Sequence, residues 1–168
     1  MERARPVGVR RHPRKRRTQV IVLREPSHAD NAFICECFAD WIAPDRYRRE
    51  RGVEWRASPA KVEVWINRWQ RPATGEECFI VETEQPVGLV SFRKHIFTAM
   101  VDNLAIHPQF RGLGYSTELL RMLKAIWVKD GIVAAEFETT PGIIRDQLGT
   151  RYEDLGNGRG RMTWDREI

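Results

Sequence analysis

Runs of apolar and β-branched residues, separated by turn-forming residues, divide the chain into expected strands. The first run lies around Val20 and ends at Glu25 and Pro26, and three closely spaced runs follow in the middle of the chain. Gly88 falls inside the second of these three, which is typical of a bulge or a close approach of another backbone. We expect strands at residues 19–24, 78–83, 86–97, 99–106, 132–138 and 161–165.

Three other segments place apolar residues at helical spacing. Ser27 with Asp30 three residues later is a capping-box variant before the first, and Ser58 with Pro59 is a start signal for the second. The third begins after Gly114. The segments, with their apolar positions, are residues 27–44 (Ile34, Cys37, Phe38, Trp41, Ile42), residues 58–70 (Val62, Trp65, Ile66, Trp69) and residues 115–130 (Leu119, Leu120, Met122, Leu123, Ile126, Trp127). A shorter helix is expected at residues 141–148.

The expected order is therefore strand, two helices, three strands, helix, strand, short helix and strand. Short turns join the three middle strands, so an antiparallel meander is their natural pairing. A length of 168 residues suits one domain, and we find no internal repeat. The pattern predicts a single domain that combines a sheet with helices.

Composition excludes several classes of protein. Apolar residues make up 42% of the chain and charged residues 30%, which is the balance of a soluble globular protein. The longest apolar run, residues 20–23, is far shorter than a membrane helix or the core of a secretory signal. The three cysteines, Cys35, Cys37 and Cys78, lack metal-ligand spacing and are interpreted as thiols in a reducing compartment. We expect a cytoplasmic protein without a membrane partner or a metal.

The net charge of +5 is unevenly distributed, because residues 1–17 carry a charge of +7 and the remainder carries −2. This basic arm has few residues to bury, so we expect it to be disordered in isolation, with the folded domain spanning residues 18–168. Three interpretations stay open for the arm: contact with a nucleic acid, a targeting signal, or a solvated tail with no partner.

The segment from Asp102 to Thr117 carries the most chemical information. An expected strand leads into a loop with Gly112 and Gly114, and the loop opens the longest expected helix. The first amides of a helix have no partner within it, and the helix dipole adds partial positive charge there. Glycines let anion oxygens approach the backbone closely, so this arrangement favours a phosphate site. The spacing is neither a P-loop nor a dinucleotide-binding fingerprint.

In its full context this segment resembles motif A of the GNAT acetyltransferase superfamily, which has the pattern Arg/Gln-x-x-Gly-x-Gly/Ala after a Leu-Ala-Val-x-Pro-like run. Leu104 to Pro108 and Arg111 to Ser116 occupy these places, with Ser116 at the position of the final glycine or alanine. The expected element order over residues 18–168 also agrees with that fold. The resemblance implies an α/β (α+β) architecture, with a mixed, largely antiparallel central sheet flanked by helices.

The resemblance also implies acetyl-CoA, or another acyl-CoA, as the co-substrate. Its pyrophosphate would lie on the backbone from Gly112 to Thr117, and its pantetheine arm would pair like an extra strand with Leu104 and Ile106. In this family the motif-A strand separates from the next strand at a bulge, which opens the slot for that arm. The implied cofactor-binding residues are Leu104, Ile106, Arg111, Gly112, Leu113, Gly114, Tyr115, Ser116 and Thr117.

An amine must lose a proton before it attacks a thioester, and a carboxylate acting through water is a common proton acceptor. Glu136, on the strand after the motif helix, stands where some family members place a glutamate, and Asp102 is a second candidate. Many members have a tyrosine that protonates the leaving thiolate, but Arg145 stands at the matching position here. Tyr152, or else solvent, is left for that role.

Three functions stay open. The first is an enzyme that transfers an acetyl (acyl) group from acetyl-CoA to a primary amine by direct attack. The second is the same chemistry on a nucleic acid, or on a nucleic-acid-bound protein held through residues 1–17. The third is a non-catalytic binding or structural module of the same fold, which Arg145 and Ser116 favour. The acceptor amine is not readable from the sequence, and a homodimer is an open alternative to a monomer.

Overall fold

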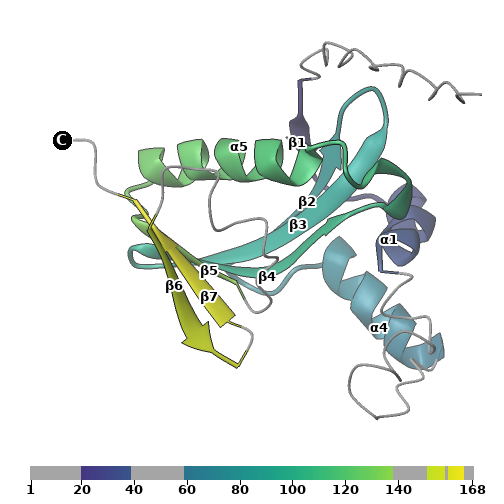
Figure 1. Cartoon of the computed structure of the whole chain (residues 1–168). Helices are drawn as coiled ribbons and strands as arrows, with labels where there is room; N and C mark the ends of the chain where they lie inside the picture. The colour runs from purple at the N-terminus through teal and green to yellow at the C-terminus, as the bar shows by residue number, and fades with distance from the viewer. Residues whose placement is uncertain (1–19, 39–58, 138–150, 158, 165–168) are drawn as a thin grey trace, which may run out of the picture.

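The computed structural model describes residues 20–38, 59–137, 151–157 and 159–164. Its seven strands form one sheet in the order β1-β2-β3-β4-β5-β7-β6 (Figure 1). The pairing is antiparallel throughout except between β4 and β5, which are parallel and joined through α5. The strands are β1 (Val22–Arg24), β2 (Glu76–Glu82), β3 (Pro86–His95), β4 (Thr98–Ile106), β5 (Ala134–Phe137), β6 (Arg151–Gly156) and β7 (Arg159–Thr163); the helices are α1 (Asn31–Cys37), α4 (Pro59–Gln70) and α5 (Tyr115–Lys129), with short 3-10 turns at His28–Asp30 and Pro108–Phe110.

This architecture confirms the expected mixed, largely antiparallel sheet and the β2–β3–β4 meander. The second and third expected helices are present with nearly the expected ends. The first is described as far as Cys37, so Trp41 and Ile42 fall outside the described residues. The basic arm of residues 1–17 and the short helix expected at residues 141–148 also lie outside them.

Strand β6 corrects the sequence analysis, which expected a loop and no strand directly before the final strand at residues 161–165. The segment pairs with β7 along its length and forms the outer edge of the sheet. Tyr152 and Leu155 are half-buried and the other four residues are exposed, three of them charged, which leaves a weak apolar signal. A hairpin therefore ends the described chain, where we expected a loop and one strand.

The two faces of the sheet carry different helices and different cores. Helix α5 covers one face, and α1 and α4 lie on the other (Figure 1). Under α5, four residues at helical spacing are fully or almost fully buried: Leu119, Leu120, Leu123 and Trp127. On the opposite face, Ile34, Phe38 and Trp69 pack against Ile80 and Leu89 of the sheet. Apolar burial thus fixes which side chains of each strand face α5, and which face the other way.

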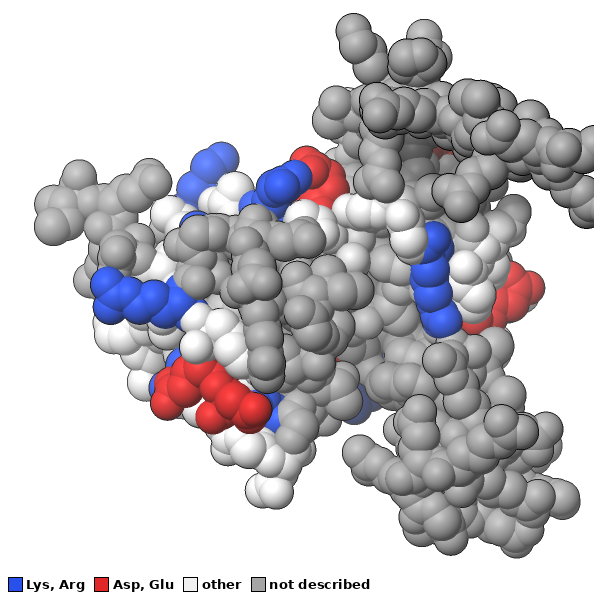
Figure 2. Space-filling view, viewed as in Figure 1, with Lys and Arg blue, Asp and Glu red and all other residues white. Residues whose placement is uncertain are grey.

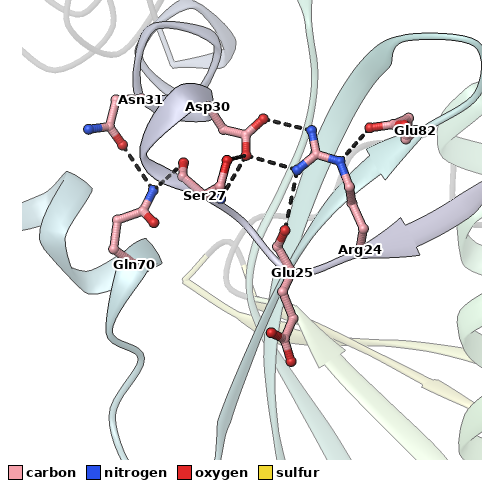
Figure 3. Close-up of polar contacts among 7 residues, drawn as sticks. All are labelled: Arg24, Glu25, Ser27, Asp30, Asn31, Gln70 and Glu82. Atoms are coloured by element: carbon pink, nitrogen blue, oxygen red, sulfur yellow. Dashed lines mark hydrogen bonds and ion pairs between the residues drawn. The ribbon is translucent and has the colours of Figure 1, made fainter.

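The N-terminal elements are short, and a polar cluster around Arg24 connects them (Figure 3). The Arg24 guanidinium donates to both carboxylate oxygens of Asp30, at 2.7 and 2.8 Å, and to Glu82 on β2. The same Asp30 carboxylate accepts from the amide and hydroxyl of Ser27, at 2.7 and 2.9 Å, which supplies the expected capping contact. Gln70 at the end of α4 donates to the Ser27 carbonyl at 2.7 Å. The cluster therefore fixes β1, α1 and α4 relative to the sheet.

Replacing Asp30 with asparagine tests this cluster. Hydrogen bonds from Arg24 hold the pKa of the Asp30 carboxyl at about 2, below its ordinary value of 3.8. Because the pKa is lower in the folded state, the ionised carboxylate adds stability above about pH 4, and this contribution is lost as the pH falls towards 2. We expect Asp30→Asn to lower the free energy of unfolding by about 1–3 kcal/mol at pH 7 in urea titrations, because Arg24 loses its charged partner.

Glu25→Gln is the matched control, since it removes a neighbouring negative charge whose exposed side chain is outside the cluster. It should change the free energy of unfolding by less than about 0.5 kcal/mol. The difference between wild type and Asp30→Asn should shrink as the pH approaches 2. Equal losses in the two variants, or a difference that does not depend on pH, would contradict the assigned role of Asp30.

Candidate active site

The described pairing of strand β4 with β5 covers the first half of β4. The two strands pair from Thr98 with Ala134 to Val101 with Phe137. Beyond Val101, β4 keeps its partner β3, and no residue of the described part of β5, which reaches Phe137, pairs with it on the other side. The register with β3 shifts at the same point: Val101 pairs with Phe92 and Asn103 with Ser91, so Asp102 is an extra residue. Among the described residues, Asp102–Ile106 therefore pairs on the β3 side alone, and we call its other side the open edge.

The backbone of this open edge is oriented by the pairing with β3. The His107 amide donates to the Val87 carbonyl at 3.0 Å, and the register is constant back to Asn103. Antiparallel pairs alternate between bonded and non-bonded residues, so Leu104 and Ile106 direct their amides and carbonyls away from β3. The Arg111 side chain confirms this orientation, because its Nε donates to the Ile106 carbonyl at 3.0 Å. The two residues expected to pair with an extended ligand thus present their polar groups to the open side.

Gly88 lets the end of β4 lie close to β3, as the sequence predicted. It is the register partner of Ile106. A Cβ at Gly88 would lie 2.6 Å from the Ala105 carbonyl oxygen and 2.8 Å from Ile106 Cδ1. The first of these contacts is to backbone, which has little room to move. Any side chain here would push β4 away from β3, which is its one partner among the described residues at this position.

The loop after β4 brings the chain round to the start of α5. Gly112 and Gly114 have φ angles of +74° and +88°, in the left-handed region that favours glycine. Space is not the constraint at Gly112, since a Cβ there would meet no atom within 4 Å. Gly114 is the N-cap of α5, so the first-turn amides of Tyr115–Thr117 lie at the positive end of the helix dipole. With the exposed Arg111 beside it, this helix start has the chemistry of an anion site.

Helix α1 packs against the end of β4 through His107. The imidazole stacks on Phe33, with ring centroids 5.4 Å apart, and its Nε2 lies 3.0 Å from Glu36 Oε2. Its Nδ1 accepts a hydrogen bond from the Gln109 amide at 3.3 Å, so His107 caps the turn before the glycine loop. Burial raises the pKa of the nearby Cys37 thiol to about 12, which keeps it protonated and unsuited to nucleophilic chemistry.

The two acidic candidates lie on the sheet face opposite α5. Asp102 makes a bidentate pair with Arg93: Nε donates to Oδ2 at 2.8 Å and Nη2 donates to Oδ1 at 2.7 Å. Glu136 lies between two arginines of β7, accepting from Arg159 Nη2 at 3.0 Å and from Arg161 Nε at 2.9 Å. We call the residues Glu76, Arg93, Asp102, Glu136 and Arg161, which cross the sheet from β2 to β7 on this face, the charged row.

Tyr152 does not join this group. It pairs with Met162 on β7 and packs against the core beneath α5, which is the other face of the sheet. Two further strands, β5 and β7, separate it from β4. The structure therefore brings Asp102 and Glu136 to one face and places Tyr152 on the opposite one. Arg145 lies outside the described residues.

The arginine partners of the acids were missed by the sequence analysis. Arg159 and Arg161 are two residues apart, a spacing that puts both side chains on one face of a strand. That signal was present, but the expected strand began only at residue 161. Arg93 gave no comparable signal, because its pairing with Asp102 depends on the bulge.

The described ranges contain no group of three or more metal-ligating side chains. No helix among them is long and apolar enough to cross a membrane. The candidate site consists of backbone polar groups of β4, the start of α5, and paired acidic and basic side chains.

Comparison with known proteins supports the same interpretation. The family model described as "Acetyltransferase (GNAT) domain" matches residues 21–142. No curated protein matches the sequence. The fold is similar to that of PaiA N-acetyltransferase from Thermoplasma acidophilum in complex with coenzyme A (15% identity, 86% of this chain and 99% of that chain, TM-score 0.57). It is also similar to an acetyltransferase from Thermus thermophilus (17% identity, 86% of this chain and 96% of that chain, TM-score 0.61). A third similar structure is a variant of the spermidine N-acetyltransferase SpeG from Vibrio cholerae (16% identity, 84% of this chain and 91% of that chain, TM-score 0.59).

At these identities the solved structures establish the fold, while the family match establishes descent and covers well over half of the chain. It spans both β4 with its bulge and the glycine loop that opens α5. The chain therefore belongs to the GNAT acetyltransferase family, whose members are acyl-CoA-dependent N-acyltransferases.

Proposed function

We propose that this protein transfers an acetyl group from acetyl-CoA to a primary amine by direct attack. The observation that carries the proposal is the continuous path from the open edge of β4 to the start of α5. That path offers an outward-facing backbone at Leu104 and Ile106, followed by two left-handed glycines at a helix N-terminus. Extended pantetheine and pyrophosphate have the matching chemistry, since one pairs with a strand edge and the other with helix amides.

The cofactor-binding roles follow from this path. The backbone from Gly112 to Thr117 would receive the pyrophosphate, including the Leu113, Tyr115 and Ser116 amides, with Arg111 adding positive charge. Because Arg111 already uses the Ile106 carbonyl, Leu104 is the stronger candidate to pair with the pantetheine arm. Acetyl-CoA supplies the activated thioester, and an outward amide of β4 would polarise its carbonyl.

Asp102 is the proton acceptor that we favour. It is the extra residue of the bulge, two positions before Leu104, whereas Glu136 lies one strand away and accepts from two arginines. In the reaction the amine nitrogen bonds to the acyl carbon, the carbon–sulfur bond breaks, and the amine proton passes through water to Asp102. The thiolate then takes a proton from solvent, since Tyr152 lies on the other face of the sheet.

Calorimetric titration with acetyl-CoA tests the cofactor path without any assumption about the acceptor. We expect wild type to bind, and Gly114→Glu to weaken binding at least about 10-fold, because a carboxylate at the helix start repels the pyrophosphate. Gly131→Glu is the matched control: its φ of +77° resembles that of Gly114, but it lies beyond the other end of α5.

Both variants carry the strain of a side chain in the left-handed region, so their thermal stabilities should fall together while their affinities diverge. Gly131→Glu should bind acetyl-CoA within about 2-fold of wild type, since like-charge repulsion is screened over this distance. Absence of binding by folded wild type at low salt would refute the proposal, as would equal weakening in the two variants.

The turnover rate with an accepted amine, measured as the release of free CoA, tests which residue is the proton acceptor. Asp102→Asn should lower kcat about 100-fold or more, because it keeps the shape but cannot take a proton, and acetyl-CoA affinity should stay unchanged. Asp130→Asn is the control, since it removes a carboxylate paired with Lys94 at 2.7 Å on the α5 side. A large loss in Glu136→Gln with normal turnover in Asp102→Asn would reassign the role to Glu136.

A further inference from the structure

The bulge in β4 places two consecutive side chains on the same face of the sheet. In a regular strand, neighbouring side chains point to opposite faces. Asp102 pairs with Arg93, whereas Asn103 donates from Nδ2 to the hydroxyl oxygen of Ser91 at 2.9 Å. Arg93 and Ser91 are two residues apart on β3, so they share a face, and the side chains that they contact share it too. A carboxylate and a carboxamide therefore lie side by side at the start of the open edge.

The two side chains belong to different rows on this face. Asp102 is part of the charged row, and at the β7 end of that row basic and acidic side chains lie side by side over the β6–β7 hairpin (Figure 2). The next row is neutral, because Cys78 of β2, Ser91 of β3 and Asn103 of β4 are register partners. Ser91 is buried and Asn103 is half-buried. The bulge thus brings an acid and a neutral amide together where the two rows meet.

The bond to Ser91 determines how the Asn103 carboxamide is turned. A carboxamide has an acceptor oxygen on one branch and an NH2 group on the other. Because Nδ2 is used on Ser91 of β3, Oδ1 is turned away from β3. A neutral hydrogen-bonded pair can be replaced by two apolar groups at little cost in stability, so the main effect of this bond is orientation.

A primary amine that attacks a thioester has two N–H groups to accommodate. The nitrogen lone pair bonds to the acyl carbon, and in the proposed reaction one of the two hydrogens then passes as a proton through water to Asp102. The carbon–sulfur bond breaks, and the thiolate takes a proton from solvent. The second hydrogen stays on nitrogen and becomes the N–H of the amide product. Away from bulk water it needs an acceptor of its own, since an unpaired buried N–H is costly.

We propose that Asn103, oriented by Ser91, binds the acceptor amine through Oδ1 and accepts the N–H that the product retains, while Asp102 takes the proton that is lost. The inference rests on the proposed function, because it adds a second residue to the acceptor side of that site. Consecutive Cα atoms are about 3.8 Å apart, so the two side chains can serve one nitrogen, Asn103 directly and Asp102 through water. The site then selects primary amines, because a neutral N-methyl amine has only the hydrogen that must leave.

The test compares primary amines with their N-methyl counterparts in the full chain at saturating acetyl-CoA, with release of free CoA as the readout. The primary amines are benzylamine, phenethylamine, ethanolamine and the amide of Nα-acetyl-lysine, and each counterpart is methylated on the reacting nitrogen. We expect kcat/KM for the best primary amine to exceed that of its counterpart at least about 10-fold in wild type. A site built to bind an N–H discriminates strongly against an analogue that lacks it.

Asn103→Leu keeps the approximate size of the side chain and removes its acceptor oxygen. It should lower kcat/KM for the primary amine about 10-fold and change that for the N-methyl amine less than about 3-fold, so the preference shrinks. A preference due only to exclusion of the methyl group would survive this change. Ser91→Ala should cause part of the same loss, because the carboxamide is then free to turn. The double variant Ser91→Ala/Asn103→Leu replaces both partners with apolar groups, and it should fold even if Asn103→Leu alone does not.

Thr98→Val is the matched control, since it removes a hydroxyl group from the same face of β4, five residues before Asn103. It should have the kcat/KM of wild type for both classes of amine. In every one of these variants the affinity for acetyl-CoA should equal that of wild type, and thermal melting verifies that they fold.

A primary-to-N-methyl preference that is unchanged in Asn103→Leu, or in the double variant where the single one does not fold, would overturn the inference. Equal kcat/KM for the two classes in wild type would also overturn it. The same holds if protein that binds acetyl-CoA acetylates none of the primary amines. Failure of wild type to bind acetyl-CoA is a separate result, because it refutes the proposed function itself and is measured independently by calorimetry.

Discussion

The site depends on one extra residue in β4. Up to Val101 this strand is bonded to β3 and β5 on its two sides, and a strand so held presents no free backbone. Asp102 shifts the register with β3, and beyond it the described residues pair with β4 on the β3 side only. The edge that opens consists of backbone polar groups, which are costly to leave without partners. An extended polar ligand can form hydrogen bonds with these groups, as a further strand would.

Other parts of the fold hold this opened strand in position. Gly88 lets β3 lie close enough to β4 to support it alone, and no larger residue fits against the Ala105 carbonyl. Helix α1 reaches the same end of β4 through the stack of Phe33 on His107. That helix has only seven residues, too few to be stable in isolation, so its position depends on Arg24 and Asp30. A partly buried ion-pair cluster thus contributes to the geometry of a site on another part of the sheet.

Periodicity in the sequence predicted the parts of the fold that repeat. The β2–β3–β4 meander, α5 and the close approach at Gly88 all follow from local spacing. Strand β6 was missed because charged residues dominate its pattern, and the side on which Tyr152 lies could not be assigned without that strand. The pairing of Asp102 with Arg93 depends on the bulge, and that of Glu136 with Arg159 depends on the register of β5 and β7. Local patterns contain neither kind of information.

The two acids of the charged row, Asp102 and Glu136, differ in their arginine partners and in their place on the sheet. A carboxylate as buried as Glu136 needs a cationic partner, because an unpaired buried charge is very costly. Two arginines of β7, Arg159 and Arg161, supply such partners. Asp102 has a single arginine and stands at the bulge, beside the edge where a thioester would lie. The arrangement is consistent with proton transfer at Asp102, while the two arginines that bind Glu136 connect β5 and β7 on the same face.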